Sequence, residues 1–390
     1  MSIKKGIQDV RTWILDRIPL KNHIVFESYP VYADNTKAVY DEMVRQGLHE
    51  KYKFFWLYLG RESIPEGVPH AKFVRYPGKN WLQNQYVIYL LHTARALISC
   101  NEFLFWRRED QYAINLTHGA ALKRTTAHYK APDEIDEFLT FSTYLAPLEE
   151  DATGCDPAKM RVLGFPRNDI LLNSQLDVHK LFPDKDFKKL IYWMPTYRQH
   201  NGGAVDTSSI TLPIIYNEEI AEQINTAAKE AGVLVVLKPH FAQDVSRLMN
   251  INLSNLVFIN DAFLRDNHVL NYEFLAKADA LLTDYSSVYY DYLLTDRPIG
   301  LCWDDYEEFS QREGLVVDVD EVMAGGEKLY TPEDLCGFIT RLAAGEDRLQ
   351  KERGEVFRLL HDYPDGESSR RVVEHIMDKL AKQEAGEAFK

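Results

Sequence analysis

Short apolar runs alternate with helical patterns along most of the chain, and this alternation predicts its secondary structure. Runs typical of buried strands occur at residues 24–26, 54–59, 96–99, 113–116 and 138–141, and then at 190–194, 233–237, 256–259, 280–283 and 299–302. Helical patterns are found at residues 37–46, 81–92, 218–231, 272–277 and 286–294, and at about 332–344, 347–361 and 368–383. This order predicts parallel sheets covered by helices on both faces.

A polar, charged stretch at residues 171–189 separates the two halves. We therefore expect an α/β protein of two Rossmann-like, doubly wound parallel-sheet domains that face each other across a cleft. The expected domains are residues 21–175 and 185–365, with a helix at 1–20 and a C-terminal helix at 366–390. In sheets of this kind, ligands bind at the carboxyl ends of the strands.

The N-terminal segment, residues 1–20, predicts an amphipathic helix with basic residues beside its apolar stripe. The apolar positions recur at helical spacing: Ile3, Ile7, Val10, Ile14 and Ile18. Such a helix can lie in a membrane interface, or it can dock its apolar side on the body of the protein. Both interpretations stay open at this point.

Composition narrows the class of protein. The 390 residues are 45% hydrophobic, which is enough for two packed domains. The 45 Lys and Arg residues against 59 Asp and Glu give a net charge of −14, which argues against a general nucleic-acid binder. The same charge argues against broad adhesion to an anionic membrane, although not against a local basic patch.

Cysteine usage and hydropathy predict the compartment. The four cysteines lie far apart and form no CxxC pair, which indicates reduced thiols and no zinc site. No signal peptide is apparent, and the apolar windows are far shorter than the ~20 residues that cross a bilayer. We therefore expect a cytoplasmic chain, peripheral on the inner face of the cell membrane if the N-terminal helix binds there.

Four polar side chains follow the apolar run at residues 280–282, namely Thr283, Asp284, Ser286 and Ser287. A helix is expected to begin near Ser286, and its first N–H groups have no partner within the helix. Together with the positive end of the helix dipole and two hydroxyls, these groups suit a phosphate. Capping is the alternative, but one cap residue accounts for only one of the four.

Three other strand ends carry similar chemistry. His118 and Gly119 follow the run at 113–116, where an imidazole can act as a general base and a glycine lets the backbone approach a ligand. Thr196 and Arg198 follow Pro195, and a guanidinium suits phosphate oxygens. The alternatives are a structural histidine and a surface ion pair.

The fourth strand end carries Lys238 and His240, directly after the run at 233–237. Because all four groups follow parallel strands, a cleft between the domains would bring them together. Such a set of donors and cations in an acidic protein predicts a pyrophosphate-containing substrate. Arg167, in the segment GFPRNDIL, either pairs with Asp169 or binds a phosphate.

Several common sites are missing from the sequence. It has no Walker A loop, no GxGxxG and no GxSxG, which excludes the standard P-loop, NAD-binding and serine-hydrolase motifs. No cluster of histidines and cysteines suggests a metal. We therefore expect no metal and no cofactor.

Five segments resemble motifs of the CDP-glycerol glycerophosphotransferases, which build teichoic acids and related polymers. In the order of that family they are THGAALKR, GFPRNDIL, WMPTYR, LKPH and LLTDYSSVYYDYLLTDRPI. The resemblance implies a GT-B-like fold of an acceptor-side and a nucleotide-donor domain. It also implies transfer of glycerol phosphate from CDP-glycerol to a hydroxyl of a lipid-linked or polymeric cell-surface glycan, with CMP released, in teichoic acid or capsule synthesis.

The resemblance also implies roles for individual residues. His118 matches the catalytic histidine and candidate base, and His240 matches a second important histidine. The candidates for binding the substrate and its phosphates are Arg198, Thr196, Lys238, Asp284, Ser286, Ser287, Gly119 and Arg167. For Asp284, nucleotide contact and helix capping both remain open.

Two departures from the family motifs bear on the donor. Thr117-His118-Gly119-Ala120-Ala121 stands where the family has W-H-G-T-P, and Phe241 stands where it has a proline. Both leave CDP-ribitol open as an alternative donor. The rival functions are a GT-B glycosyltransferase that uses a nucleotide sugar and a non-catalytic, membrane-associated assembly factor. The length of the chain favours a primer-like enzyme over a long-chain polymerase.

Overall fold

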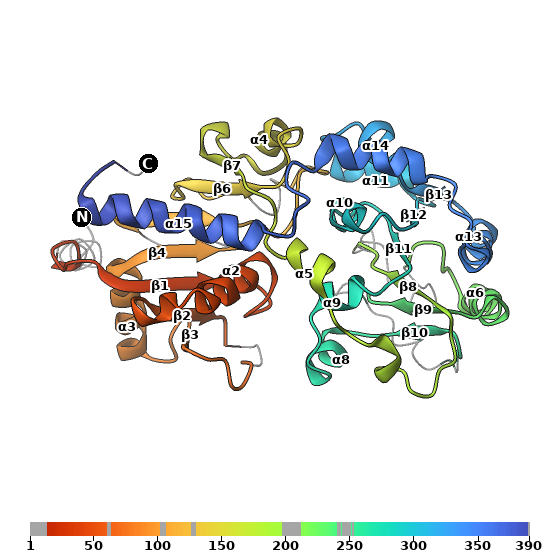
Figure 1. Cartoon of the computed structure of the whole chain (residues 1–390), viewed down its shortest axis with the longest axis horizontal. Coiled ribbons are helices and arrows are strands. Elements are labelled where there is room, and N and C mark those ends of the chain that lie inside the picture. The colour runs from red at the N-terminus through yellow and green to blue at the C-terminus, as the bar shows by residue number, and fades with distance from the viewer. Residues whose placement is uncertain are drawn as a thin grey trace, which may run out of the picture. The chain divides into compact units, whose positions relative to one another are not determined.

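The computed structural model describes residues 14–60, 64–101, 107–125, 130–196, 212–239, 243, 251 and 253–388 (Figure 1). These residues form two compact units. The first contains the described residues of Met1–Ala120, Tyr129–Asp169 and Asp362–Lys390, and the second those of Ala121–His128 and Ile170–His361. The chain therefore contributes a short segment to the second unit after Ala120, builds the rest of that unit from Ile170, and returns to the first unit at Asp362.

The first unit is built on a seven-stranded parallel sheet with strand order β3-β2-β1-β4-β5-β6-β7. The strands are β1 (Lys21–Glu27), β2 (Lys53–Tyr58), β3 (Ala71–Arg75), β4 (Ala94–Ser99), β5 (Tyr112–Asn115), β6 (Glu137–Thr140) and β7 (Met160–Val162). The helices are α2 (Asp34–Arg45), α3 (Trp81–Thr93), α4 (Glu149–Thr153) and α15 (Ser368–Ala385). Helix α5 (Asn168–Asn173) spans the boundary with the second unit.

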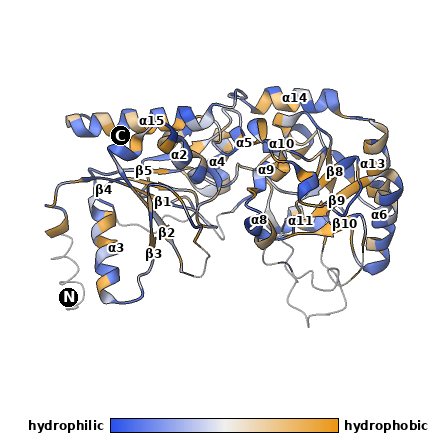
Figure 2. Cartoon of the chain, turned by 60° about the horizontal axis from the view of Figure 1, so that its bottom comes forward, coloured by the Kyte–Doolittle hydropathy of each residue, from blue (hydrophilic) through white to orange (hydrophobic). Residues whose placement is uncertain are grey.

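Both faces of this sheet are covered, which explains why β1 is apolar without alternation. On one face, the ring of Phe26 lies 5.5 Å from that of Tyr40 in α2. On the other face, Val25 and Phe55 share a buried cluster with Leu90 of α3. Figure 2 shows α3 on the side of the sheet opposite α2 and α15.

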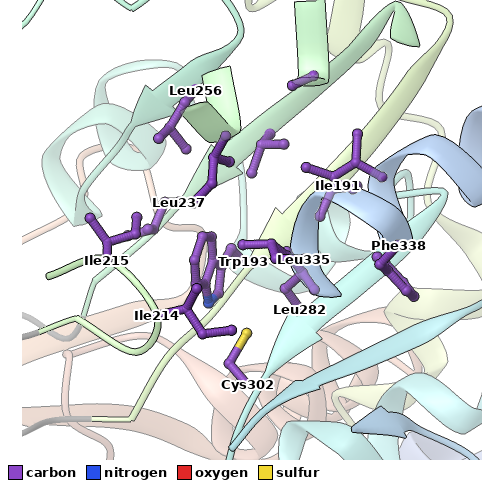
Figure 3. Packing of buried hydrophobic residues seen from close by; sticks show 14 of the residues in the cluster. Ile191, Trp193, Ile214, Ile215, Leu237, Leu256, Leu282, Cys302, Leu335 and Phe338 are labelled. Atoms are coloured by element: carbon purple, nitrogen blue, oxygen red, sulfur yellow. The ribbon is translucent and has the colours of Figure 1, made fainter. Parts of the chain in front are cut away.

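The second unit contains a six-stranded parallel sheet with strand order β10-β9-β8-β11-β12-β13. Its strands are β8 (Lys189–Trp193), β9 (Val233–Leu237), β10 (Leu256–Phe258), β11 (Ala280–Thr283), β12 (Ile299–Cys302) and β13 (Glu327–Leu329). Its helices are α6 (Glu218–Ala231), α8 (Asp261–Asp266), α9 (Asn271–Leu275), α10 (Val288–Tyr292), α11 (Tyr306–Glu313), α12 (Val319–Val322), α13 (Pro332–Ala344) and α14 (Gln350–Leu360). Figure 3 shows its core, in which Trp193 and Leu282 pack with Leu335 of α13.

The predicted parallel α/β architecture is confirmed, and each of the ten apolar runs contains a strand. The ten runs leave out three edge strands, β3, β7 and β13. The first two are half-exposed along their length, and the third has three residues, of which only Leu329 is buried. An edge strand covered on one side carries too few apolar side chains to stand out from its flanks.

Two expectations concern membranes. Among the described residues, every helix is either too short or too polar to reach across a bilayer. The amphipathic helix expected at residues 1–20 falls mostly outside the part of the chain that the structure describes.

Candidate active site

The His118 loop follows β5 at the carboxyl edge of the first sheet. Thr117 has a φ of 45°, in the left-handed region, so the chain turns sharply before His118. The hydroxyl of Thr117 donates to the carbonyl of Gly119 at 2.9 Å, which closes the turn. The histidine is exposed, while Thr117 before it is buried.

Asn35 holds this loop from inside the protein. Its side-chain amide donates to the carbonyls of Leu116 and Thr117, at 3.0 and 2.9 Å. Its oxygen accepts the backbone N–H of Arg167 at 3.1 Å. One fully buried side chain in the first turn of α2 thus joins the loop after β5 to the loop after β7.

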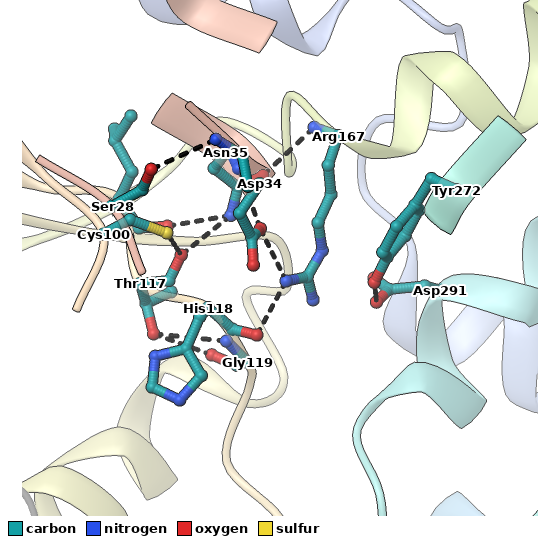
Figure 4. Close-up of polar contacts among 12 residues, drawn as sticks. Ser28, Asp34, Asn35, Cys100, Thr117, His118, Gly119, Arg167, Tyr272 and Asp291 are labelled. Carbon is teal, nitrogen blue, oxygen red and sulfur yellow. Dashed lines mark hydrogen bonds and ion pairs between the residues drawn. The ribbon is translucent and has the colours of Figure 1, made fainter. Parts of the chain in front are cut away.

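Arg167 contacts the same loop with its guanidinium. Its Nη1 donates to the carbonyl of His118 at 2.6 Å and to a carboxylate oxygen of Asp34 at 2.8 Å. Figure 4 shows the carbonyl of His118 directed toward Arg167 and the imidazole directed away from it. The described contacts of Arg167 therefore position the backbone of the histidine, and the predicted phosphate contact stays a prediction.

Two further contacts steady the loop. Asn115 accepts the N–H of Thr117 at 2.8 Å and donates to the hydroxyl of Ser99 at 3.1 Å. The thiol of Cys100 donates to the carbonyl of Thr117 at 2.9 Å, and burial raises the pKa of this thiol. A protonated thiol keeps its donor, so Cys100 acts as a hydrogen-bonding group here and not as a nucleophile.

The described contacts of Asp169 are with a distant helix, and its predicted pairing with Arg167 stays a prediction. Its carboxylate accepts the N–H groups of Ser368 and Ser369, at 3.0 and 2.7 Å. These are the first residues of α15, whose early N–H groups have no partner within the helix. Asp169 therefore caps a helix that begins 199 positions further along the chain.

In the second unit, Asp284 joins two strand ends. The N–H of Thr196 donates to both carboxylate oxygens of Asp284, each at 3.0 Å. The N–H of Tyr285 donates to one of these oxygens at 2.7 Å. The side chain is fully buried. Asp284 therefore fixes the loop after β8 to the loop after β11, and its two open roles, nucleotide contact and helix capping, stay predictions.

Ser286 and Ser287 lie at the start of α10 and are half-buried. Their carbonyls accept the N–H groups of Tyr289 and Tyr290, at 3.1 and 3.0 Å. The hydroxyl of Ser286 makes only a long contact of 3.4 Å with the N–H of Val288. Ser287 is the N-cap residue, but its side chain makes no cap hydrogen bond. Simple capping therefore accounts poorly for the two hydroxyls.

Lys238 follows β9, the neighbour of β8 in the sheet. Its ammonium lies 2.7 Å from a carboxylate oxygen of Asp261, and 14% of its side chain is exposed. Lys238, Thr196 and Ser286 thus follow adjacent strands at one edge of the second sheet. Arg198 and His240 lie outside the described residues, so their predicted roles stay predictions.

No group of three or more histidine, cysteine, aspartate or glutamate side chains in the described part of the chain has the geometry to hold a metal ion. The sequence reasoning missed Asp34 and Asn35. A signal was present, because this polar pair opens the helix that comes after the buried strand β1. What the sequence did not indicate is that Asn35 would point at the neighbouring loop.

Comparison with known proteins identifies the family. Residues 12–378 match the model of the CDP-glycerol:poly(glycerophosphate) glycerophosphotransferases. The chain belongs to this family. The predicted family and enzyme class, a glycerophosphotransferase, are confirmed.

Two curated relatives illustrate the range of this family. The chain is 26% identical to a teichoic acid glycerol-phosphate primase of Bacillus subtilis, over 90% of this chain and 91% of the primase. It is 24% identical to a teichoic acid poly(glycerol phosphate) polymerase of Staphylococcus epidermidis, over 87% of this chain. It spans only 47% of the length of that polymerase.

Solved structures confirm the predicted GT-B-like fold class. The wall teichoic acid polymerase TagF is similar with a TM-score of 0.71 and 21% identity, over 98% of this chain and 96% of that one. A UDP-GlcNAc 2-epimerase from Neisseria meningitidis is similar with a TM-score of 0.52 and 14% identity, over 91% and 99% of the two chains. At these identities the likeness concerns the fold alone.

Proposed function

We propose that this chain transfers glycerol phosphate from CDP-glycerol to a hydroxyl of a lipid-linked or polymeric glycan, with release of CMP, in teichoic acid synthesis. The observation that carries the proposal is the His118 loop. A family motif that includes a histidine stands at the carboxyl end of a parallel strand, on a backbone held by buried hydrogen bonds. Membership of the glycerophosphotransferase family supports the donor and the reaction.

In the proposed reaction, the acceptor oxygen attacks the β-phosphorus of the donor. The imidazole of His118 takes the proton of the attacking hydroxyl, and a new bond forms between that oxygen and phosphorus. The bond from the β-phosphorus to the bridging oxygen breaks, and its electron pair leaves with CMP. A positioned general base contributes typically about 10²–10⁴-fold to the rate.

The hydrogen bonds around His118 support this role through preorganisation. Three donors fix the backbone of the loop, from Asn35, Arg167 and Cys100, while the imidazole remains exposed. A base whose backbone is already fixed needs little further ordering during the reaction.

The second unit is proposed to bind the donor. Ser286 and Ser287 offer hydroxyls in the loop after β11. Lys238 carries a positive charge and follows β9, which lies two strands from β11 in the sheet. Asp284 serves these groups indirectly because it fixes the backbone beside them. Arg198 and His240 are assigned to the donor phosphates and to catalysis by their motifs alone.

A donor screen tests the proposal. The purified chain is incubated with CDP-glycerol, CDP-ribitol or UDP-sugars and a lipid-linked acceptor, and the released nucleotide is measured. CMP from CDP-glycerol supports the proposal. CMP from CDP-ribitol alone would replace glycerol by ribitol, and release of nucleotide only from UDP-sugars would overturn the proposal.

Substitution of His118 tests the mechanism. His118→Ala should lower kcat by roughly 10²–10⁴-fold with an unchanged melting temperature, because the side chain is exposed and its backbone carries the structural contacts. His179→Ala, at an exposed histidine elsewhere, serves as the matched control. Equal turnover by both variants would remove His118 from the chemistry.

A further inference from the structure

The chain crosses into the second unit directly after the His118 loop. It leaves the first unit after Ala120 and returns to it at Tyr129. The described part of this crossing, residues 121–125, is called the 121–125 segment below. Only Gly119 and Ala120 separate it from His118. Because ordering a connecting segment costs conformational entropy, the contacts that hold this one in place need a reason.

Two backbone hydrogen bonds fix the 121–125 segment to the second unit. The N–H of Arg124 donates to the carbonyl of Gly314 at 2.8 Å, and the N–H of Val316 donates to the carbonyl of Leu122 at 3.0 Å. An antiparallel β-bridge lies between these two bonds. The side chain of Leu122 is buried. The segment is therefore anchored along its backbone and not only by its side chains.

A tyrosine of α10 holds the start of the 121–125 segment. The hydroxyl of Tyr290 donates to the carbonyl of Ala121 at 3.3 Å, and both residues are 1% exposed. The backbone N–H of Tyr290 donates to the carbonyl of Ser287 at 3.0 Å. Ser287 is one of the two serines proposed to bind the donor. One short helix therefore carries the proposed donor hydroxyls before its first residue and an anchor of the His118 loop in its middle.

A second contact leads from the 121–125 segment to the same motif. The ammonium of Lys123 lies 5.4 Å from the ring centre of Phe309 in α11. The ring of Phe309 stacks on that of Tyr285, with 3.8 Å between the ring centres and 15° between the planes. Tyr285 stands between Asp284 and Ser286. Two independent contacts thus connect the segment with the residues on either side of the two serines.

The sequence of the 121–125 segment gives such an anchor a use. Ala121 stands where the family motif has proline. Proline fixes φ near −65°, so an alanine in its place leaves the backbone after His118 more freedom. The hydrogen bond from Tyr290 to the carbonyl of Ala121 limits this freedom from outside the loop.

We propose that Tyr290 is a positioning residue for His118, because it ties the backbone that leaves the catalytic loop to the unit that binds the donor. The inference rests on the proposed function, since it concerns the same base and the same donor groups. Asn35 and Cys100 hold the loop on the side before His118, and Tyr290 holds the chain after it. A reacting group displaced by about 1 Å can lose roughly 10²-fold in rate, so restraint on both sides matters.

The alternative is that these contacts only pack a connecting segment. Loss of the Tyr290 hydroxyl would then lower stability, and any effect on turnover would be the same with or without the imidazole of His118. A positioning contact behaves differently, because it has nothing to position once the imidazole is removed. The two roles are therefore separated by combining substitutions at the two residues.

A double-mutant cycle with the full chain tests the proposal. Tyr290→Phe removes only the hydroxyl, and it should lower the kcat for CMP release by roughly fivefold, the change expected from the loss of one net hydrogen bond. The KM for CDP-glycerol should stay the same, because the donor groups are untouched. In a chain that already carries His118→Ala, Tyr290→Phe should leave the residual single-turnover rate unchanged.

Tyr292→Phe is the matched control. Tyr292 belongs to the same helix, is fully buried, and donates its hydroxyl to the carbonyl of Ala278 at 2.7 Å. This variant loses the same kind of hydrogen bond away from the 121–125 segment. It should lower the melting temperature and keep the kcat of the natural chain. Thermal melting of every variant checks that the fold is intact.

Hydrogen exchange gives a readout that needs no substrate. The N–H groups of Arg124 and Val316 close the two backbone hydrogen bonds of the 121–125 segment and report on its attachment. Peptides that cover these two N–H groups should exchange faster in Tyr290→Phe than in the natural chain. In Tyr292→Phe their exchange should be unchanged. This measurement stands whether or not the donor is CDP-glycerol.

Four outcomes would overturn the positioning role. They are the natural kcat in Tyr290→Phe, an equal loss of kcat in Tyr292→Phe, the same fivefold loss in the chain that carries His118→Ala, and unchanged hydrogen exchange in Tyr290→Phe. Failure of the proposed function is recognised separately. In that case the natural chain itself would release no CMP from CDP-glycerol.

Discussion

At the scale of the residue, the sequence indicated where the candidate base stands in the fold but not what holds it there. Polar groups at strand ends pointed to His118, and the structure places it at the carboxyl edge of the sheet. The residue that fixes its loop, Asn35, lies 82 positions before Thr117 and looks in the sequence like part of a helix start. Which neighbour a buried amide selects depends on tertiary packing, and a single sequence carries no record of it.

Replacing Asn35 by aspartate tests this support with almost no change in size. The two N–H donors to Leu116 and Thr117 are lost, and a carboxylate oxygen then faces two carbonyls. We expect destabilisation of about 1–3 kcal/mol, because the carbonyl of Leu116 loses this donor and a buried carboxylate lies against both carbonyls. The kcat for CMP release should fall by roughly 10²-fold because the base is displaced.

The KM for CDP-glycerol is expected to stay the same, since the proposed donor groups belong to the second unit. Melting curves and steady-state kinetics measure these effects. Asn22→Asp, the same change at an exposed position of β1, should alter neither. If Asn35→Asp kept the kcat and melting temperature of the natural chain, the amide would not be what positions the loop.

At the scale of the element, the sequence predicted buried strands well because parallel strands with helices on both faces are apolar without interruption. It did not predict the charged residue inside such a strand. Glu137 opens β6 and is 1% exposed. Its carboxylate accepts from His375 at 2.6 Å and lies 2.9 Å from the ammonium of Lys379, both on α15. Arg161 of β7 completes the set at 2.7 Å.

This cluster makes the docking of α15 dependent on pH. Burial alone would raise the pKa of Glu137, but hydrogen bonds from His375, Tyr112 and Lys379 lower it to about 2 from the ordinary 4.5. Because the folded pKa lies below the unfolded one, the contribution is complete above pH 4.5 and is lost as the pH falls toward 2. It amounts to roughly 3 kcal/mol.

We therefore expect Glu137→Gln to lower the melting temperature most at neutral pH. The difference in melting temperature between this variant and the natural chain, called the gap below, should narrow as the pH falls from 4.5 toward 2. Melting curves against pH measure the gap. Glu374→Gln, at a glutamate of α15 with 56% of its side chain exposed, is the control and should produce a small, nearly constant difference. A gap that stayed constant from neutral pH down to pH 2 would show that the cluster is not the source.

At the scale of the whole molecule, the amphipathic pattern predicted a helix at residues 368–383 but not which sheet it covers. An apolar stripe specifies that a helix needs an apolar partner, and both units offer one. The structure assigns α15 to the first unit, where Asp169 caps its first turn and α2 packs along it. That choice rests on contacts between segments 199 or more residues apart, which local patterns do not encode.

Ending the chain after His361 should consequently unfold the first unit and spare the second. The truncation removes Val372, Val373, Ile376 and Leu380, which are all fully buried. At about 1.5–3 kcal/mol for each side chain, the loss is comparable to the whole stability of a typical domain, about 5–15 kcal/mol. Hydrogen exchange should show protection lost in β1 and β4–β7 and kept in β8, β9 and β11. As a control, a chain ended after Gly386 keeps all of α15 and should match the natural protein. If the first sheet kept its protection after truncation at His361, this sheet would close its core without the returning helix α15.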